Sequence, residues 1–217
     1  MKYSAVVFDL DGTLVNSLQD LADATNYALT KLGKPVHEVR QYRYLVGQGL
    51  RNLIKDALGV GNEGLIDEGM RLFHEYYDVH MYDHTGPYEG VVGMLKDVQA
   101  AGVKIGVLSN KPNSATKEVV EKLLKEIEFD AVFGAREGVP IKPNPKGLHD
   151  TLAYLGVEGK GCMYVGDSKV DMLTGKSAGL FTVGVTWGFR DEAELQQNGA
   201  DVLVHDAEQL KMEILGM

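Results

Sequence analysis

Polar side chains that suit phosphoryl chemistry follow several apolar segments of the sequence. They are Asp9 and Asp11, Ser109 and Asn110, Lys142, and Asp167 and Asp171. Carboxylates that gather at one place repel one another unless a cation lies among them, and oxygen ligands of this kind suit Mg²⁺. A lysine and a hydroxyl group beside them are typical of a site that holds a phosphoryl group. These residue types therefore predict magnesium-dependent chemistry on a phosphate.

The elements that would bring these residues together form an alternating pattern. The apolar run 3–8 is typical of a buried parallel strand and stops at Asp9. After residue 86 the pattern predicts helices at 91–101, at 115–125 and after Pro145, and strands at 103–109, 131–133, 162–165, 181–185 and 202–204. This alternation predicts an α/β protein with a Rossmann-like parallel-sheet core. Ligands of such sheets bind beyond the carboxyl ends of the strands, which is where the polar residues fall.

The segment between the first strand and the alternating strands and helices shows only the pattern of helices. Apolar residues recur at helical spacing over 18–32, 50–58 and 66–77, and no strand pattern occurs from Asn16 to His84. We therefore expect an α/β core domain made of residues 1–15 and 86–217, with an inserted α-helical domain at residues 16–85.

Local spacing adds two expectations about the site. Asp171 follows Asp167 by four residues, so a helix that begins at Ser168 would turn both carboxylates to the same side. Ser109 and Asn110 also suit the N-cap of a helix, and Ser109 could serve as a cap and as a phosphate ligand.

Charge and composition exclude several classes of protein. The 217 residues include 22 basic and 31 acidic side chains, and the net charge of −9 disfavours binding to nucleic acid or to an anionic membrane. No run approaches the ~18 apolar residues of a membrane helix, and the start of the chain lacks a signal-peptide pattern, so we expect a cytoplasmic protein. The single cysteine, Cys162, falls in a strand pattern, which predicts a buried and inert thiol. None of these features predicts an oligomeric state.

Two further motifs favour ordinary structure over a ligand site. His74, His80 and His84 are spaced by six and four residues without a supporting acid, which favours surface histidines over a metal site. The segment 175–177 resembles the end of a phosphate-binding P-loop, but Val170 stands where that motif requires glycine.

The ordered motifs resemble those of the haloacid dehalogenase superfamily, whose phosphohydrolases use an aspartate nucleophile. The matched segments are Asp9-Leu10-Asp11-Gly12-Thr13, then Ser109-Asn110, then Lys142-Pro143-Asn144-Pro145, and then Gly166-Asp167-Ser168 with Asp171. The helical insertion is similar to the cap domain of the first subclass of that superfamily. Residues 46–51 and 185–189 are similar to segments of phosphoglycolate phosphatases.

The resemblance implies a role for each matched residue. Asp9 would attack phosphorus and form an aspartyl phosphate, and Asp11 would act first as general acid and then as general base. Mg²⁺ would be held by Asp9, Asp167 and the backbone carbonyl of Asp11, with Asp171 supporting the ion directly or through water. The phosphoryl oxygens would contact Asp9, Gly12, Thr13, Ser109, Asn110 and Lys142.

The implied substrate is a small phosphorylated metabolite, with phosphoglycolate as the first candidate. Its carboxylate needs a cation, and Arg51, near the start of an amphipathic helix of the cap, could provide one or could be a solvated helix arginine. A sugar-phosphate mutase of the same superfamily shares the motifs and the cap, and is the alternative enzyme. A phospho-receiver signalling domain also combines acids, Mg²⁺, a hydroxyl group and a lysine, and is the alternative outside enzymes.

Overall fold

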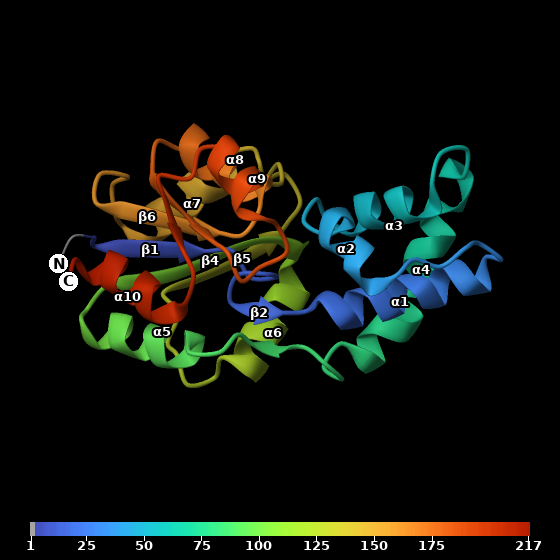
Figure 1. Cartoon of the computed structure of the whole chain (residues 1–217), viewed down its shortest axis with the longest axis horizontal. Helices are drawn as coiled ribbons and strands as arrows, with labels where there is room; N and C mark the ends of the chain where they lie inside the picture. The colour runs from blue at the N-terminus through green and yellow to red at the C-terminus, as the bar shows by residue number, and fades with distance from the viewer. Residues whose placement is uncertain (1–2) are drawn as a thin grey trace. The chain divides into compact units, whose positions relative to one another are not determined.

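Six parallel strands form the central sheet (Figure 1). The structure, a computed structural model, describes residues 3–217. The strands lie in the order β5 (Ala131–Ala135), β4 (Lys104–Pro112), β1 (Ala5–Phe8), β6 (Cys162–Gly166), β7 (Phe181–Val185) and β8 (Val202–Val204). Val7 of β1 is paired with Gly106 of β4 on one side and with Tyr164 of β6 on the other. Because all neighbouring strands run parallel, their carboxyl ends meet at one edge of the sheet.

Helices cover both faces of this sheet (Figure 1). One face carries α5 (Val91–Ala100), α6 (Asn113–Leu123) and α10 (Ala207–Leu215), and the other carries α7 (Lys146–Leu155), α8 (Lys169–Ser177) and α9 (Glu192–Gln197). This is the arrangement that right-handed crossovers between parallel strands produce. It confirms the predicted α/β architecture with a Rossmann-like parallel-sheet core.

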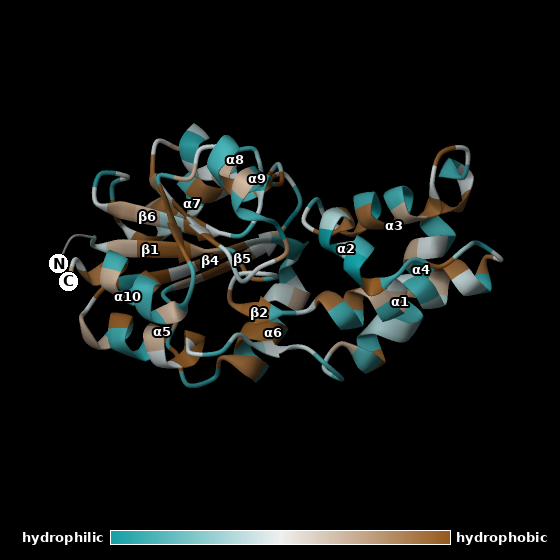
Figure 2. Ribbon diagram, viewed as in Figure 1, coloured by the Kyte–Doolittle hydropathy of each residue, from teal (hydrophilic) through white to brown (hydrophobic). Residues whose placement is uncertain are grey.

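The apolar strands are short and uninterrupted because both of their faces are buried. Ala5 and Val7 pack under α7 against Leu148 and Leu152. Alternate residues of the same strand, such as Phe8, are equally buried on the other face. Figure 2 shows the result: the strands are mostly hydrophobic, whereas the helices mix hydrophobic and hydrophilic residues. A charged side chain such as Asp9 therefore follows the strand only where the strand ends, at the carboxyl edge of the sheet.

A second compact unit consists of helices. It contains α1 (Leu18–Lys31), α2 (Val39–Leu45), α3 (Leu50–Leu58), the short 3₁₀ helix η1 (Glu63–Leu65) and α4 (Ile66–His80). α4 packs along α1, and Leu29, Ile54 and Phe73 are among the buried side chains of this unit. The apolar stripes found at helical spacing are therefore the faces that pack together here.

The chain divides into these two units at the short strands β2 (Val15–Asn16) and β3 (Gly86–Pro87), which pair with each other. One unit is Met1–Val15 with Pro87–Met217, and the other is Asn16–Gly86. That the helical unit serves the other as a cap stays a prediction. No helix among residues 3–217 combines the length and the apolar character needed to span a membrane.

Several elements differ from the expectation. α2, α9 and α10 were not predicted, and α2 contributes one buried side chain, Tyr42, too few to make a helical stripe. Asn16 ends a strand in a segment that showed no strand pattern. β4 continues to Pro112 rather than ending at Ser109, which changes the setting of the residues that follow Ser109.

Candidate active site

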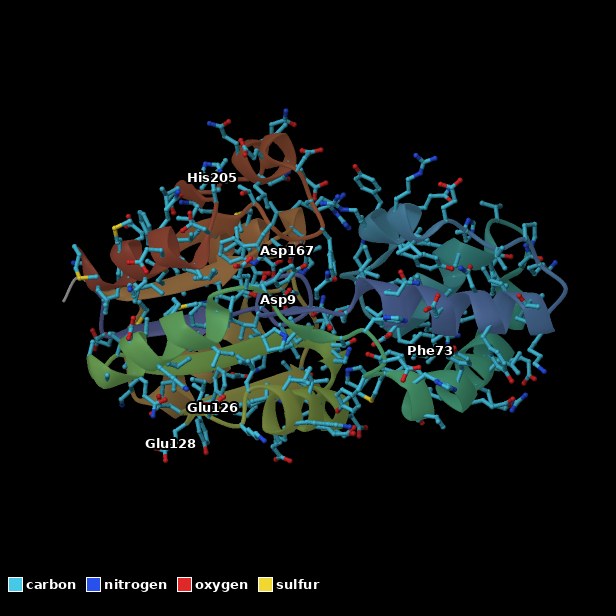
Figure 3. The ribbon with its side chains drawn as sticks, turned by 60° about the horizontal axis from the view of Figure 1, so that its bottom comes forward. Asp9, Phe73, Glu126, Glu128, Asp167 and His205 are labelled. Carbon is cyan, nitrogen blue, oxygen red and sulfur yellow. The ribbon has the colours of Figure 1, made fainter. Side chains whose placement is uncertain are left out.

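Three buried acids meet at the carboxyl edge of the sheet. Asp9 directly follows β1, Asp167 directly follows β6, and Asp171 lies in the first turn of α8. Carboxylate oxygens of all three lie within 4.8 Å of one another. Figure 3 shows Asp9 and Asp167 close together in the sheet-containing unit. The structure thus brings together residues that are separated by more than 150 positions in the sequence.

Lys142 supplies the cation among these acids. It lies between β5 and α7, and its Nζ is 2.8 Å from Oδ1 of Asp9 and 2.7 Å from Oδ1 of Asp171. Burial by itself would lower the pKa of Lys142, but the negative charges of Asp171 and Asp9 outweigh it and raise that pKa well above its ordinary value. Lys142 therefore stays protonated and can serve as a fixed positive charge.

One ammonium group does not balance three carboxylates. Burial, together with the charge of Asp171, raises the pKa of Asp9 well above the usual range for aspartate and the pKa of Asp167 to about 7. Three negative charges and one positive charge leave a formal deficit of two positive charges. A divalent ion with a preference for carboxylate oxygens fits that deficit, so the donor set and its charge suit Mg²⁺.

Backbone and side-chain donors hold Asp167 in place. Phe189 N donates to its Oδ2 at 2.7 Å, and Thr13 Oγ1 donates to its Oδ1 at 3.3 Å. Gly12 has a φ of +92°, and a β-carbon there would collide with the Asp167 carboxylate. A glycine is needed because two loops approach each other closely around one acid. Trp187 ties the same loops together, since its Nε1 donates to the Thr13 carbonyl at 3.0 Å.

Asp171 reaches the site in a different way from the one expected. Asp167 lies before α8 rather than on it, so the two acids do not share a helix face. Asp171 instead folds back over the helix start, where its Oδ2 accepts bonds from Ser168 N at 3.2 Å and Ser168 Oγ at 2.6 Å. Its Oδ1 accepts a bond from the buried Tyr164 hydroxyl at 3.1 Å. Asp171 is therefore the most firmly held of the three acids. The sequence did not predict Tyr164 as a residue of the site.

Ser109 and Asn110 lie inside β4, and the prediction of a helix N-cap was wrong. α6 begins at Asn113, and Ser109 Oγ accepts a bond from Lys111 N at 3.1 Å. The register between β4 and β5 shifts between Leu108 and Pro112, an irregularity of the kind that redirects side chains beside active sites.

The side chain of Asn110 positions Lys142. Its Nδ2 donates to the Lys142 carbonyl at 3.0 Å, and its Oδ1 accepts from Lys142 N at 2.9 Å. Asn110 was expected to contact phosphate, but its carboxamide is already used to fix the backbone of the lysine. No local pattern could reveal a pairing between residues 32 positions apart.

Lys111 is a second buried lysine that sequence reasoning missed. Its Nζ lies 3.2 Å and 3.3 Å from the two carboxylate oxygens of Asp11, and 5% of the Lys111 side chain and 13% of the Asp11 side chain are exposed. Lys111 directly follows two polar residues in the sequence, a pattern that does not distinguish it from a surface lysine.

Arg51 lies in the helical unit at the start of α3. Its Nη1 donates to Oδ1 of Asp67 at 2.6 Å, and both side chains are largely exposed. A contact between Arg51 and a substrate stays a prediction.

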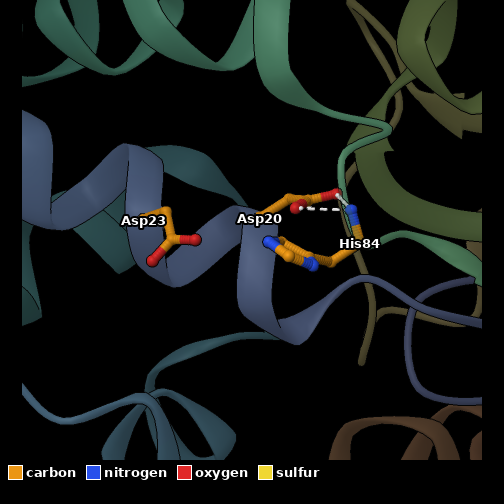
Figure 4. A group of neighbouring side chains, drawn as sticks. All are labelled: Asp20, Asp23 and His84. Carbon is orange, nitrogen blue, oxygen red and sulfur yellow. Dashed lines mark hydrogen bonds between the residues drawn. The ribbon is translucent and has the colours of Figure 1, made fainter.

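A second group of possible ligands lies in the helical unit, where Asp20 and Asp23 of α1 approach His84 (Figure 4). The Asp20 carboxylate is already used: it accepts bonds from His84 N at 3.0 Å, Thr85 N at 2.8 Å and Thr85 Oγ1 at 2.6 Å. The group thus fastens the chain after α4 to the start of α1. His74 and His80 are exposed and pair with Asp78 and Asp83 instead.

Comparison with known proteins identifies the family. Residues 6–185 match the haloacid dehalogenase-like hydrolases. The chain belongs to this family. The phosphoglycolate phosphatase of Psychrobacter arcticus is 32% identical over 206 residues, which cover 91% of this chain and 89% of the relative. The phosphoglycolate phosphatase of Colwellia psychrerythraea is 31% identical over 201 residues, 89% of each chain.

Solved structures agree with this membership. A protein from Lactobacillus delbrueckii subsp. bulgaricus, whose assignment as a phosphoglycolate phosphatase is provisional, has a TM-score of 0.88 and 33% identity over the whole of both chains. A haloacid dehalogenase-like protein from Bacteroides fragilis has a TM-score of 0.89 at 23% identity, which shows the fold. The chain is a phosphoric monoester hydrolase of this family. These likenesses do not favour the mutase, and membership of a hydrolase family argues against a receiver domain.

Proposed function

We propose that this enzyme hydrolyses a small phosphate monoester, phosphoglycolate, through an aspartyl-phosphate intermediate that forms on Asp9. The observation that carries the proposal is the buried cluster of Asp9, Asp167, Asp171 and Lys142 beside Asp11. The names of the relatives support the choice of substrate. A cytoplasmic location stays a prediction.

Asp9 is the nucleophile in this proposal. Its carboxylate oxygen attacks phosphorus in line, and the bond from phosphorus to the leaving oxygen breaks as the aspartyl phosphate forms. Lys142, 2.8 Å from Asp9, draws the phosphoryl group toward it and stabilises the ionised carboxylate. A bound Mg²⁺ would supply the positive charge that offsets repulsion between the nucleophile and the phosphate. Asp9, Asp167 and the Asp11 carbonyl would hold the ion, with Asp171 supporting it.

Asp11 moves the protons. In the first step its carboxyl group donates a proton to the departing alkoxide, which leaves as an alcohol. In the second step the Asp11 carboxylate takes a proton from a water molecule that attacks phosphorus, and phosphate and free Asp9 result. Asp11 lies two residues after Asp9, in the segment that follows β1, which puts a second carboxyl group beside the nucleophile.

The remaining site residues hold the phosphoryl oxygens. Ser109 precedes Asn110 in β4, and the Asn110 side chain fixes the backbone of Lys142. The backbone amides of Gly12 and Thr13 are already used inside the loop after Asp11, where they donate to the carbonyls of Val15 at 2.8 Å and Leu10 at 3.2 Å, so their contact with phosphate stays a prediction. Ser109 and Lys142 would gather the negative charge that spreads over the phosphoryl oxygens in the transition state.

A phosphate-release screen tests the proposal. The purified protein is incubated with a panel of phosphorylated metabolites that includes phosphoglycolate, glycerol phosphate and hexose phosphates, with Mg²⁺ and with Asp9→Asn as the inactive control. We expect release from phosphoglycolate to have the highest kcat/KM. Conversion of one sugar phosphate into another, dependent on a trace of sugar bisphosphate, would support the mutase instead.

A further inference from the structure

Lys111 is a lysine held firmly at the carboxyl edge of the sheet. Its backbone is fixed on both sides, because Lys111 N donates to Ser109 Oγ at 3.1 Å and the Thr116 hydroxyl donates to the Lys111 carbonyl at 3.2 Å. Lys111 lies near the end of β4, the strand that separates β5, at the margin of the sheet, from β1, which leads to Asp9 and Asp11. Burying a lysine is costly, so a buried ammonium at this place needs a negative partner.

Asp11 is the partner that the structure provides, and it also marks where the leaving group must lie. Nζ of Lys111 is within 3.3 Å of both Asp11 oxygens. In the proposed reaction Asp11 gives its proton to the departing oxygen, so the leaving group must lie against the Asp11 carboxyl group. The carboxylate carbon of glycolate is two bonds from that oxygen, so the carboxylate must also lie near Asp11, the residue that Lys111 contacts.

We propose that Lys111 receives the carboxylate of the leaving group and so selects phosphoglycolate over phosphate monoesters whose leaving group carries no charge. This inference rests on the proposed function. An ammonium group can serve two carboxylates at once, as Lys142 does for Asp9 and Asp171. Lys111 would likewise hold Asp11 and the substrate carboxylate, which keeps both negative charges paired in a partly desolvated site. Arg51 differs from it, because the Arg51 guanidinium is exposed and paired with Asp67.

A role limited to positioning Asp11 makes a different prediction from a role in recognising the substrate. A lysine that only orients Asp11 affects every substrate by the same factor, because Asp11 protonates every leaving group. A lysine that binds the carboxylate also affects the ratio of kcat/KM between a substrate with that carboxylate and one without it. The ratio of kcat/KM between the two kinds of substrate therefore distinguishes the two roles, whereas the loss of activity by itself does not.

The experiment compares phosphoglycolate with 2-phosphoglycolamide in the wild-type enzyme and in Lys111→Met. In 2-phosphoglycolamide a neutral carboxamide of the same size replaces the carboxylate. We expect the wild type to prefer phosphoglycolate. In Lys111→Met both substrates should be hydrolysed more slowly. The ratio of kcat/KM for phosphoglycolate to kcat/KM for 2-phosphoglycolamide should fall by about tenfold or more, the size expected for a lost charge-assisted hydrogen bond. Most of this fall should come from a higher KM for phosphoglycolate. Lys111→Arg, which keeps the charge, should recover part of the ratio.

Lys176→Met is the matched control, since Lys176 also pairs with an aspartate, Asp201, at 2.7 Å but at an exposed position. Its ratio should equal that of the wild type. The ratio does not depend on the fraction of folded enzyme, and Lys111→Gln, which also removes the charge, gives the same test should Lys111→Met not fold. An unchanged ratio in Lys111→Met or Lys111→Gln overturns the inference. A wild type that hydrolyses phosphoglycolate and 2-phosphoglycolamide equally well also overturns the inference but leaves the proposed function standing, whereas a wild type that does not hydrolyse phosphoglycolate overturns the proposed function.

Discussion

The two acidic groups of this protein look alike as lists of residues and differ in what surrounds them. In the helical unit, Asp20 is saturated by backbone and hydroxyl donors, and Asp23 accepts bonds from Gln19 at 2.9 Å and 3.1 Å. In the sheet unit, burial and mutual repulsion raise the pKa of both Asp9 and Asp167, and one lysine serves two acids. An acidic cluster becomes a candidate cation site when its charge is buried and its donors are too few.

The same contrast exists within the sheet unit. Asp171 accepts bonds from Ser168, Tyr164 and Lys142, and Asp167 accepts bonds from Phe189 N and the Thr13 hydroxyl. We interpret Asp171 as the fixed member that orients Lys142 and adds negative charge, and the other two as the acids that react with substrate or hold the ion.

Asp9→Asn should have the largest effect on the rate of phosphate release. An active variant would contradict the different roles assigned to the two acidic groups. The amide is nearly the same size but is not a competent nucleophile, so phosphate release should fall by about 10³-fold or more. The measurement is steady-state phosphate release from phosphoglycolate with Mg²⁺. Release at a rate comparable to the wild type, after a second purification to remove contaminants, would remove Asp9 from its assigned role.

Asp167→Asn should have the next largest effect, on the metal. Chelation should abolish wild-type activity, and added Mg²⁺ should restore it, with Ca²⁺ a poor substitute because its coordination shell is larger and more flexible. In Asp167→Asn the Mg²⁺ concentration for half-maximal activity should rise by about tenfold or more, since a charged ligand is lost. A metal titration that coincides with that of the wild type would contradict the assignment.

Arg51→Ala tests whether the helical unit also contributes to substrate binding. We expect kcat/KM for phosphoglycolate to fall by about tenfold, as for one charge-assisted hydrogen bond, and kcat/KM for an aryl phosphate to fall less. Asp67→Asn is the matched control, because it releases Arg51 from its ion pair without removing it. Equal losses on both substrates would indicate a general defect, and no loss would remove Arg51 from the site.

Asp20→Ala should have the smallest effect on activity and sharpens the contrast between the two acidic groups. Removing the carboxylate leaves Thr85 N and other buried donors without partners, which should lower the free energy of unfolding by about 1–3 kcal/mol. The Mg²⁺ titration should remain that of the wild type. Urea denaturation and the Mg²⁺ titration of activity, measured in parallel, provide the check. A shifted Mg²⁺ titration with unchanged stability would instead indicate that the group of Asp20, Asp23 and His84 is a metal site.

Local patterns were enough for the main elements of the site. A strand buried on both faces must be short and apolar, so the positions where β1 and β6 end were visible from the sequence, and with them Asp9 and Asp167. The strand–helix alternation likewise predicted the parallel sheet, because that order of elements admits few other folds. Strong periodicity predicted α1, α3 and α4, whereas α2 lacked a stripe.

The sequence by itself determined which residue types reach the carboxyl edge, because that depends on where each strand ends along the chain. Tertiary structure decided how they pair. Asn110 fixes Lys142, Tyr164 donates to Asp171, and Lys111 is buried against Asp11, and each pairing depends on strand order and register. A lysine after two polar residues has the local pattern of a surface residue. It becomes a buried charge because β4 continues past Ser109 beside β5 and the Lys111 side chain meets Asp11, and no local pattern contains that fact.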